Sequence, residues 1–141
     1  MERKLVITGG ICILLGIILG AFGAHGLKDL LKNDPEVLKK IGSFETGVRY
    51  QMYTGFSLLI MGINHSKFSF SFKSIYIFWL LGTILFSCSI YFLTIQSAIG
   101  VSLKFLGPVT PLGGLFMIIG WFVFLYKVIK TPINQQQESK A

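Results

Sequence analysis

Residues 5–24 read LVITGGICILLGIILGAFGA, a run of 20 residues without a charged side chain. As an α-helix, such a run is about 30 Å long, which matches the hydrocarbon thickness of a bilayer. Its basic start, Arg3-Lys4, and the small residues Ala21-Phe22-Gly23 also fit a signal peptide and its cleavage site. The length of the run and three later apolar runs favour a retained membrane-spanning helix, so the whole chain is read as a membrane protein.

The composition supports this interpretation. Of the 141 residues, 52% are hydrophobic and only 13% are charged, whereas about a quarter of the residues in a soluble domain are charged. The net charge of +7 comes from short basic clusters beside the apolar runs, which favours contact with lipid headgroups and argues against a nucleic-acid partner. Cys12 and Cys88 lie inside apolar runs without metal-ligand spacing, so no cofactor, metal or disulfide is expected.

Three further apolar runs follow the first. Together they predict an all-α integral membrane protein whose four transmembrane helices form an antiparallel bundle. The expected spans are 5–24, 44–64, 74–94 and 111–129, in a single domain of residues 1–130 followed by a disordered polar tail at 131–141. The fourth span has a clear start, because Thr110 is a suitable N-cap and Pro111 suits the first helical position.

The connection between the first two spans, residues 25–43, has a helix signal of its own. Asp34 suits an N-cap, Pro35 suits the first helical position, and apolar residues recur near helical spacing up to Gly42. We expect a short amphipathic helix from Asp34 to Gly42 in the membrane interface, which either covers the end of the bundle or senses the membrane surface.

The second span is the most polar. Its uninterrupted apolar block, residues 52–63, would cover only about 18 Å, so the helix has to take Glu45, Arg49 and Gln51 into or against the bilayer edge. Glu45 and Arg49 are four residues apart, a spacing that favours an ion pair within the helix. Two interpretations remain open: Arg49 anchors the helix to headgroups, or the charged pair faces the interior of the bundle.

Small residues mark the expected helix contacts. In the first span, glycines recur at steps of three and four residues and form one narrow stripe, which allows another backbone to come close. The expected packing positions are Gly9, Gly16, Gly20, Gly23, Gly113 and Gly120. They would pack helices within the chain or form the face of a homo-oligomer.

Four antiparallel spans bring the end of the first helix and the starts of the second and fourth to one membrane face. The candidate polar site there consists of His25, Lys28, Glu45, Arg49, Gln51, Tyr53 and Thr110. His25 would either close the first helix or act as a ligand or a pH-responsive contact of Glu45. Seven of the 13 basic residues would lie on the face with both termini and six on the other, which favours cytoplasmic termini.

Several ordered motifs make the chain resemble a known family. They are Gly20-Ala21-Phe22-Gly23-Ala24-His25-Gly26-Leu27, Val48-Arg49-Tyr50-Gln51-Met52-Tyr53 and Leu106-Gly107-Pro108-Val109-Thr110-Pro111-Leu112-Gly113-Gly114. From about residue 5 to 128, the sequence resembles the small bacterial inner-membrane family called domain of unknown function 423. The resemblance implies a four-helix protein of the cytoplasmic membrane without an established activity. Family members usually carry a histidine where this chain has Thr54, so no two-histidine metal or proton site is expected.

Three classes of function are compatible with such a protein. Catalysis is not expected, because His25 and His65 would lie on opposite faces and no nucleophile or metal site accompanies them. A small transporter or channel would use Glu45, Arg49 and Gln51 as its polar site, although these residues lie near one membrane edge rather than at the midplane. We expect a structural, lipid-binding or accessory protein, whose partners are anionic membrane lipids, a second copy or another membrane subunit.

Overall fold

The computed structural model describes residues 1–131, and this part of the chain contains no β-strand. Its helices are α1 (Arg3–Ala24), α2 (Gly26–Leu30), α3 (Val37–Ile63), α4 (Lys73–Thr83), α5 (Ser89–Ile95) and α6 (Val109–Lys130). A π-helical segment, η2 (Ile84–Cys88), joins α4 and α5 into one rod, and the 3-10 turns η1 (His65–Lys67) and η3 (Lys104–Leu106) lie in two connections. The all-α prediction is confirmed for the described residues, whereas the predicted tail falls outside them except for Thr131.

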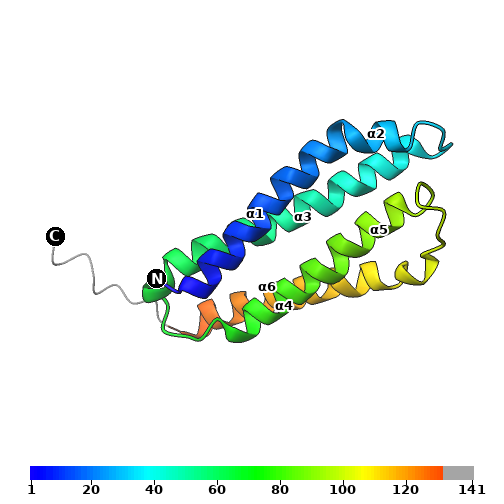
Figure 1. Cartoon of the computed structure of the whole chain (residues 1–141). Coiled ribbons are helices and arrows are strands. Elements are labelled where there is room, and N and C mark those ends of the chain that lie inside the picture. Colours follow the sequence, from blue (N-terminus) through cyan, green and yellow to red (C-terminus); the bar gives the residue numbers. More distant parts are fainter. Residues whose placement is uncertain (132–141) are drawn as a thin grey trace.

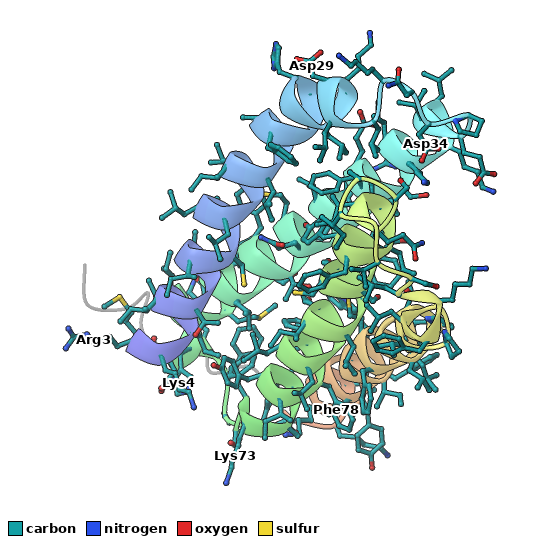
Figure 2. All side chains as sticks on the ribbon, turned by 45° about the vertical axis from the view of Figure 1, so that its right-hand side comes forward. Arg3, Lys4, Asp29, Asp34, Lys73 and Phe78 are labelled. Atoms are coloured by element: carbon teal, nitrogen blue, oxygen red, sulfur yellow. The ribbon has the colours of Figure 1, made fainter. Side chains whose placement is uncertain are left out.

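The long helices form two antiparallel pairs (Figure 1). α1 packs along α3, and the rod of α4, η2 and α5 packs along α6. We call the end with the N-terminus and the α3–α4 connection the terminal end, and the end with α2 and the α5–α6 connection the loop end. Figure 2 places Lys4 and Lys73 at the terminal end and Asp29 and Asp34 at the loop end, so charged side chains stand at both ends.

Glycines let the helices of each pair approach at backbone distance. A Cβ atom on Gly9 of α1 would lie 2.7 Å from the carbonyl oxygen of Gly55 in α3, and one on Gly113 of α6 would lie 2.3 Å from the amide nitrogen of Phe86. The other expected packing positions face side chains of the paired helix: Gly16 faces Met52, Gly20 faces Val48, Gly23 faces Phe44 and Gly120 faces Trp79. Because lipid provides no hydrophobic drive for helix association, such close packing is a main source of cohesion.

Three helical segments are long and apolar enough to cross a membrane, namely Arg3–Ala24, Lys73–Ile95 and Lys104–Lys130. α3 has 27 residues, which is more than a crossing needs. It is not among the three segments, because charged and amide side chains interrupt its first half. Composition therefore does not identify α3 as a fourth span, and its packing against α1 is the property that bears on this role.

α3 also differs from its prediction at its start. The separate interfacial helix expected from Asp34 to Gly42 does not form; one helix runs from Val37 to Ile63. The physical reason is that nothing breaks the helix between the two predicted segments, since no proline lies between Pro35 and Ile63 and the single glycine at Gly42 costs a helix only about 1 kcal/mol. The sequence reading did not include α2, whose Leu27 packs with Phe44 of α3 in a buried cluster at the loop end.

Candidate functional site

The first two residues of the predicted polar site lie where α1 ends and α2 begins. His25 is exposed at the junction of α1 and α2, and Lys28 is exposed within α2. The His25 side chain makes no capping hydrogen bond to either helix, although its backbone carbonyl accepts the Asp29 amide at 3.4 Å. The helix therefore closes at His25 through its backbone and not through the imidazole.

Glu45 and Arg49 lie on the outer face of α3. Both are exposed, and Arg49 Nη2 donates to Thr46 Oγ1 at 3.0 Å rather than to Glu45. The two residues border a shallow cavity of about 240 Å³ between α1 and α3, beside Gly20 and Gly23. The guanidinium thus leans back toward the start of α3, as helical side chains do, and toward the loop end.

Gln51 points the opposite way, into the bundle, and only 8% of it is exposed. Its Nε2 donates to the carbonyl oxygen of Cys12 in α1 at 3.0 Å, and its Oε1 accepts from the Tyr91 hydroxyl in α5 at 2.9 Å. Residues two apart in a helix lie about 200° apart around its axis. Gln51 therefore joins the two helix pairs, while the body of α3 separates it from Arg49.

Tyr53 and Thr110 border two different cavities. Tyr53 is 60% exposed, lies beside Tyr50, and lines an aromatic groove of about 270 Å³ between α3 and α6. Thr110, at the start of α6, shares a hydrogen bond of 2.7 Å with Ser89 of α5. The seven predicted residues are thus distributed over several surfaces and do not form one site.

Buried hydroxyl groups join the two helix pairs beside the π-helical segment. Thr83 Oγ1 donates to Thr54 Oγ1 at 2.7 Å, and Ser87 Oγ donates to the carbonyl oxygen of Gly47 at 2.8 Å. All three hydroxyl side chains are buried. In apolar surroundings such groups need internal partners, so these bonds hold α3 against the α4–α5 rod.

A cleft of about 350 Å³ opens at the loop end between α3, α5 and the start of α6. We call it the loop-end cleft. Its lining combines charged, hydroxyl and apolar side chains; Glu36 and Lys39 are exposed, whereas Lys40 is largely covered and Thr94 and Ile90 are buried. The lining residues are the charged Glu36, Lys39 and Lys40, the hydroxyl-bearing Ser43, Thr46, Thr94 and Thr110, and the apolar Ile90 and Leu93.

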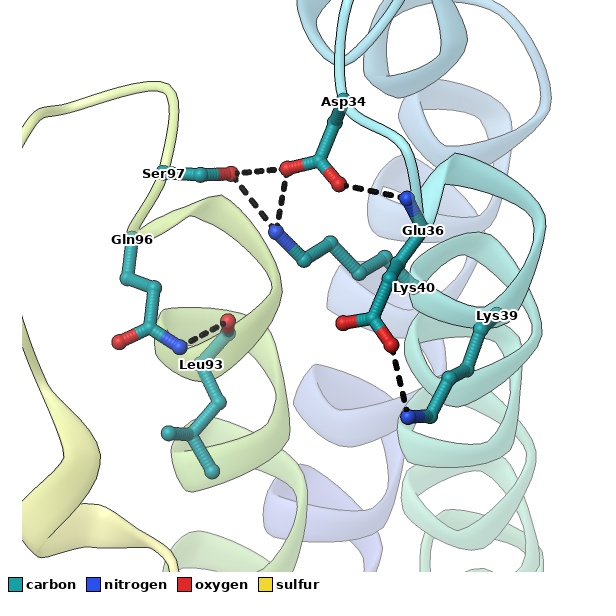
Figure 3. Close-up of polar contacts among 7 residues, drawn as sticks. All are labelled: Asp34, Glu36, Lys39, Lys40, Leu93, Gln96 and Ser97. Atoms are coloured by element: carbon teal, nitrogen blue, oxygen red, sulfur yellow. Dashed lines mark hydrogen bonds and ion pairs between the residues drawn. The ribbon is translucent and has the colours of Figure 1, made fainter.

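A polar tie holds one side of this cleft in place (Figure 3). Lys40 Nζ donates to Asp34 Oδ2 and, at 2.8 Å, to Ser97 Oγ. Ser97 Oγ also donates to Asp34 Oδ2 at 2.7 Å, and the Glu36 amide donates to Asp34 Oδ1 at 2.9 Å. The bonds from Lys40, Ser97 and the amide lower the pKa of the Asp34 carboxyl from 3.8 to about 2. The tie fixes the start of α3 to the end of α5.

Sequence reasoning did not find this tie. Asp34 has the signature of an N-cap, and nothing in the sequence points to Ser97, which lies 63 residues further on. Thr83, Ser87 and Tyr91 are spaced four residues apart, which puts them on one face of the α4–α5 rod, and all three bond to α3. Within residues 1–131, no group of three His, Cys, Asp or Glu side chains could hold a metal ion.

The comparisons with known proteins bear on this arrangement. The profile of the family described as "Protein of unknown function (DUF423)" matches residues 19–114. The chain belongs to this family. A UPF0382 membrane protein of Staphylococcus haemolyticus is 34% identical to it over 130 residues, which cover 91% of this chain and 97% of that protein. The UPF0382 membrane protein YwdK of Bacillus subtilis is 35% identical over 130 residues, which cover 91% of this chain and 98% of YwdK.

No solved structure matches the chain. Membership of DUF423 confirms the resemblance seen in the sequence motifs, and the relatives are named as membrane proteins of bacteria. All residues that line the loop-end cleft, from Glu36 to Thr110, lie inside the region that the DUF423 profile matches. The cleft is therefore built from the part of the chain that defines the family.

Proposed function

We propose that this protein crosses the bacterial cytoplasmic membrane with four spans and holds an anionic phospholipid in the loop-end cleft. The mixed lining of the cleft carries the proposal. Lys39 is exposed at the cleft, Ser43, Thr46 and Thr94 supply hydroxyl groups, and Ile90 is a buried apolar side chain. A phospholipid presents matching groups, namely an anionic phosphate, polar glycerol esters and apolar acyl chains.

The charges that line the cleft leave one lysine available to a lipid phosphate. Lys40 is engaged by Asp34, with both side chains largely covered. Lys39 contacts Glu36 at 3.0 Å, but the Lys39 side chain is 76% exposed. An exposed pair of this kind contributes at most about 1 kcal/mol, so a phosphate can replace Glu36 as its partner at little cost.

The packing of α3 supports its role as the fourth span. Gly9 of α1 meets Gly55 of α3, and Gly23 of α1 meets Phe44, so the two helices are in contact over most of the length of α1. A bilayer that surrounds α1 therefore also surrounds α3. Arg49 leans toward the loop end, and so brings its charge toward headgroups while its backbone lies deeper. The even number of spans puts both termini on one side, and the basic residues favour the cytoplasmic side.

The geometry does not favour the transporter alternative. A transport site would need Glu45, Arg49 and Gln51 in one cavity. Glu45 and Arg49 face outward and Gln51 is buried between the helix pairs. We therefore assign Arg49 to anchoring and Gln51 to packing.

Lipid retention tests the proposal. The wild-type protein and the variant Lys39→Gln are placed in phosphatidylcholine nanodiscs with a minority of phosphatidylglycerol, and co-released lipid is counted by native mass spectrometry. Each lysine near a headgroup contributes about 1 kcal/mol, so we expect retention to fall about fivefold. Lys32→Gln, which removes an exposed lysine of the same end outside the cleft, is the control. Equal retention by all three proteins would contradict the proposal.

A further inference from the structure

A second cavity, of about 260 Å³, lies at the terminal end, where the start of α1 meets the connection between α3 and α4 and the first residues of α4. We call it the terminal cavity. Its polar lining consists of Glu2, Lys4, His65, Ser71, Lys73 and Tyr76. These residues come from three separate stretches of the chain, so the cavity exists only in the folded protein.

The walls of the terminal cavity are held by specific contacts. Lys4 Nζ lies over the Tyr76 ring, 4.8 Å from its centroid, and the Tyr76 hydroxyl is 3.3 Å from Thr8 Oγ1. On the other side, Lys127 Nζ of α6 donates to the carbonyl oxygen of Ser71 at 2.7 Å. The lining is therefore fixed to α1, α4 and α6 before any ligand is present.

The lining has more donors than acceptors. Among the described residues, neither the Lys4 nor the Lys73 ammonium group has a carboxylate partner within 4.0 Å. Glu2, the one carboxylate that lines the cavity, has its Oε2 atom 3.8 Å from His65 Nε2. The two lysine ammonium groups and the Ser71 hydroxyl group can therefore donate hydrogen bonds to a ligand whose polar atoms are all acceptors.

We infer that the terminal cavity binds a phosphate group. A phosphate oxygen accepts charge-assisted hydrogen bonds from ammonium groups and brings the negative charge that the cavity lacks. Lys4 and Lys73 each stand next to the apolar run of their helix, which puts them at headgroup level in the membrane. The same chemistry fits an anionic phospholipid headgroup and a soluble phosphate, and the two sources are separated by experiment.

The inference is independent of the proposed function. The terminal cavity and the loop-end cleft share no residue and lie at opposite ends of the molecule. Lys4 also lies outside the region that the DUF423 profile matches. A variant of one site therefore leaves the other site as an internal reference.

The test uses the double variant Lys4→Gln, Lys73→Gln of the full chain. Its control is Lys67→Gln, which removes an exposed lysine at the same end that does not line the cavity. One arm counts retained phosphatidylglycerol by native mass spectrometry from nanodiscs, as above. A second arm titrates inorganic phosphate into the protein in phosphatidylcholine nanodiscs and follows phosphorus-31 line broadening. The melting temperature of each variant shows whether it is folded. The double variant Lys4→Arg, Lys73→Arg keeps both positive charges and so shows whether charge is what the ligand needs.

At about fivefold per lysine, we expect the glutamine double variant to bind its ligand about 25-fold more weakly. The control and the arginine variant should bind as the wild type does. Loss of phosphatidylglycerol alone supports a lipid headgroup as the ligand, and loss of inorganic phosphate supports a soluble phosphate. If the wild type binds neither probe, or if Lys67→Gln weakens binding as much as the double variant, the inference is overturned.

Discussion

Asp34 is the residue whose environment departs most from what its position in the sequence suggests. It begins a predicted helix, yet its carboxylate accepts bonds from Lys40, Ser97 and the Glu36 amide. These partners come from the start of α3 and the end of α5. A single carboxylate thus joins the two helix pairs at the loop end, next to the loop-end cleft.

This tie should make stability depend on pH. The pKa of Asp34 falls from 3.8 to about 2 on folding, so the charged carboxylate stabilises the fold above about pH 4, and this contribution is lost as the pH falls through about 2. Unfolding in mild detergent should therefore show a stability difference between the wild type and Asp34→Asn at pH 6 that shrinks toward pH 2. Asp29→Asn, which removes an exposed carboxylate of α2 at the same end but outside the tie, is the matched control, and an equal pH-dependent difference for both variants would contradict the prediction.

Arg49 and Gln51 are close in the sequence of α3 but have different roles, since one faces outward and the other packs inside the bundle. The two residues are two positions apart, yet Arg49 is exposed and Gln51 is buried between α1 and α5. Helical periodicity predicts that they point in opposite directions. It does not tell which one points inward, because that depends on which face of α3 the other helices cover.

At the level of elements, the helix pair α1–α3 depends on positions where no side chain fits. Gly9 and Gly10 are adjacent in α1 and have opposite surroundings. A Cβ atom on Gly9 would meet backbone atoms of Gly55 and Leu59 at 2.7 Å, whereas one on Gly10 would meet nothing within 4 Å. Backbone cannot move aside as the end of a flexible side chain can, so the pair of helices would have to separate.

We therefore expect Gly9→Ala to lower the free energy of unfolding by about 1–3 kcal/mol, as overpacking does. Gly10→Ala should leave it unchanged or raise it by up to about 1 kcal/mol, because alanine is the better helix former. Denaturant unfolding in detergent micelles, followed by circular dichroism, measures both. If the two substitutions change the free energy of unfolding equally, the α1 and α3 backbones are not in close contact at Gly9, and the prediction is wrong.

The rod of α4, η2 and α5 is an element that sequence patterns describe only in part. Its apolar length predicts a span. The π-helical turn at Ile84–Cys88 has no such signal. It lies where Phe86 meets Gly113 of α6, so its position follows from the contact between two helices.

For the whole molecule, the decisive question is whether α3 crosses the membrane. If it does, residue 33 before α3 and residue 67 after it lie on opposite sides. Asn33→Cys and Lys67→Cys, each made in a background with Cys12→Ala and Cys88→Ala, should react with a membrane-impermeant maleimide from opposite sides of sealed vesicles. Labelling of both positions from the same side would mean that α3 does not cross, and the four-span proposal would fail.

The sequence by itself determined that the chain is an all-helical membrane protein of the DUF423 family, and it indicated which glycines pack and where most helices lie. Apolar length and glycine spacing are local properties, because each can be read from a single segment of the sequence without knowledge of its neighbours in space. The tertiary structure decided that Glu45 and Arg49 face outward, that Gln51 faces inward, and that Asp34 meets Ser97. It also created both cavities with cationic linings. These features depend on contacts between residues distant in the chain, and no local pattern encodes which faces of two helices meet.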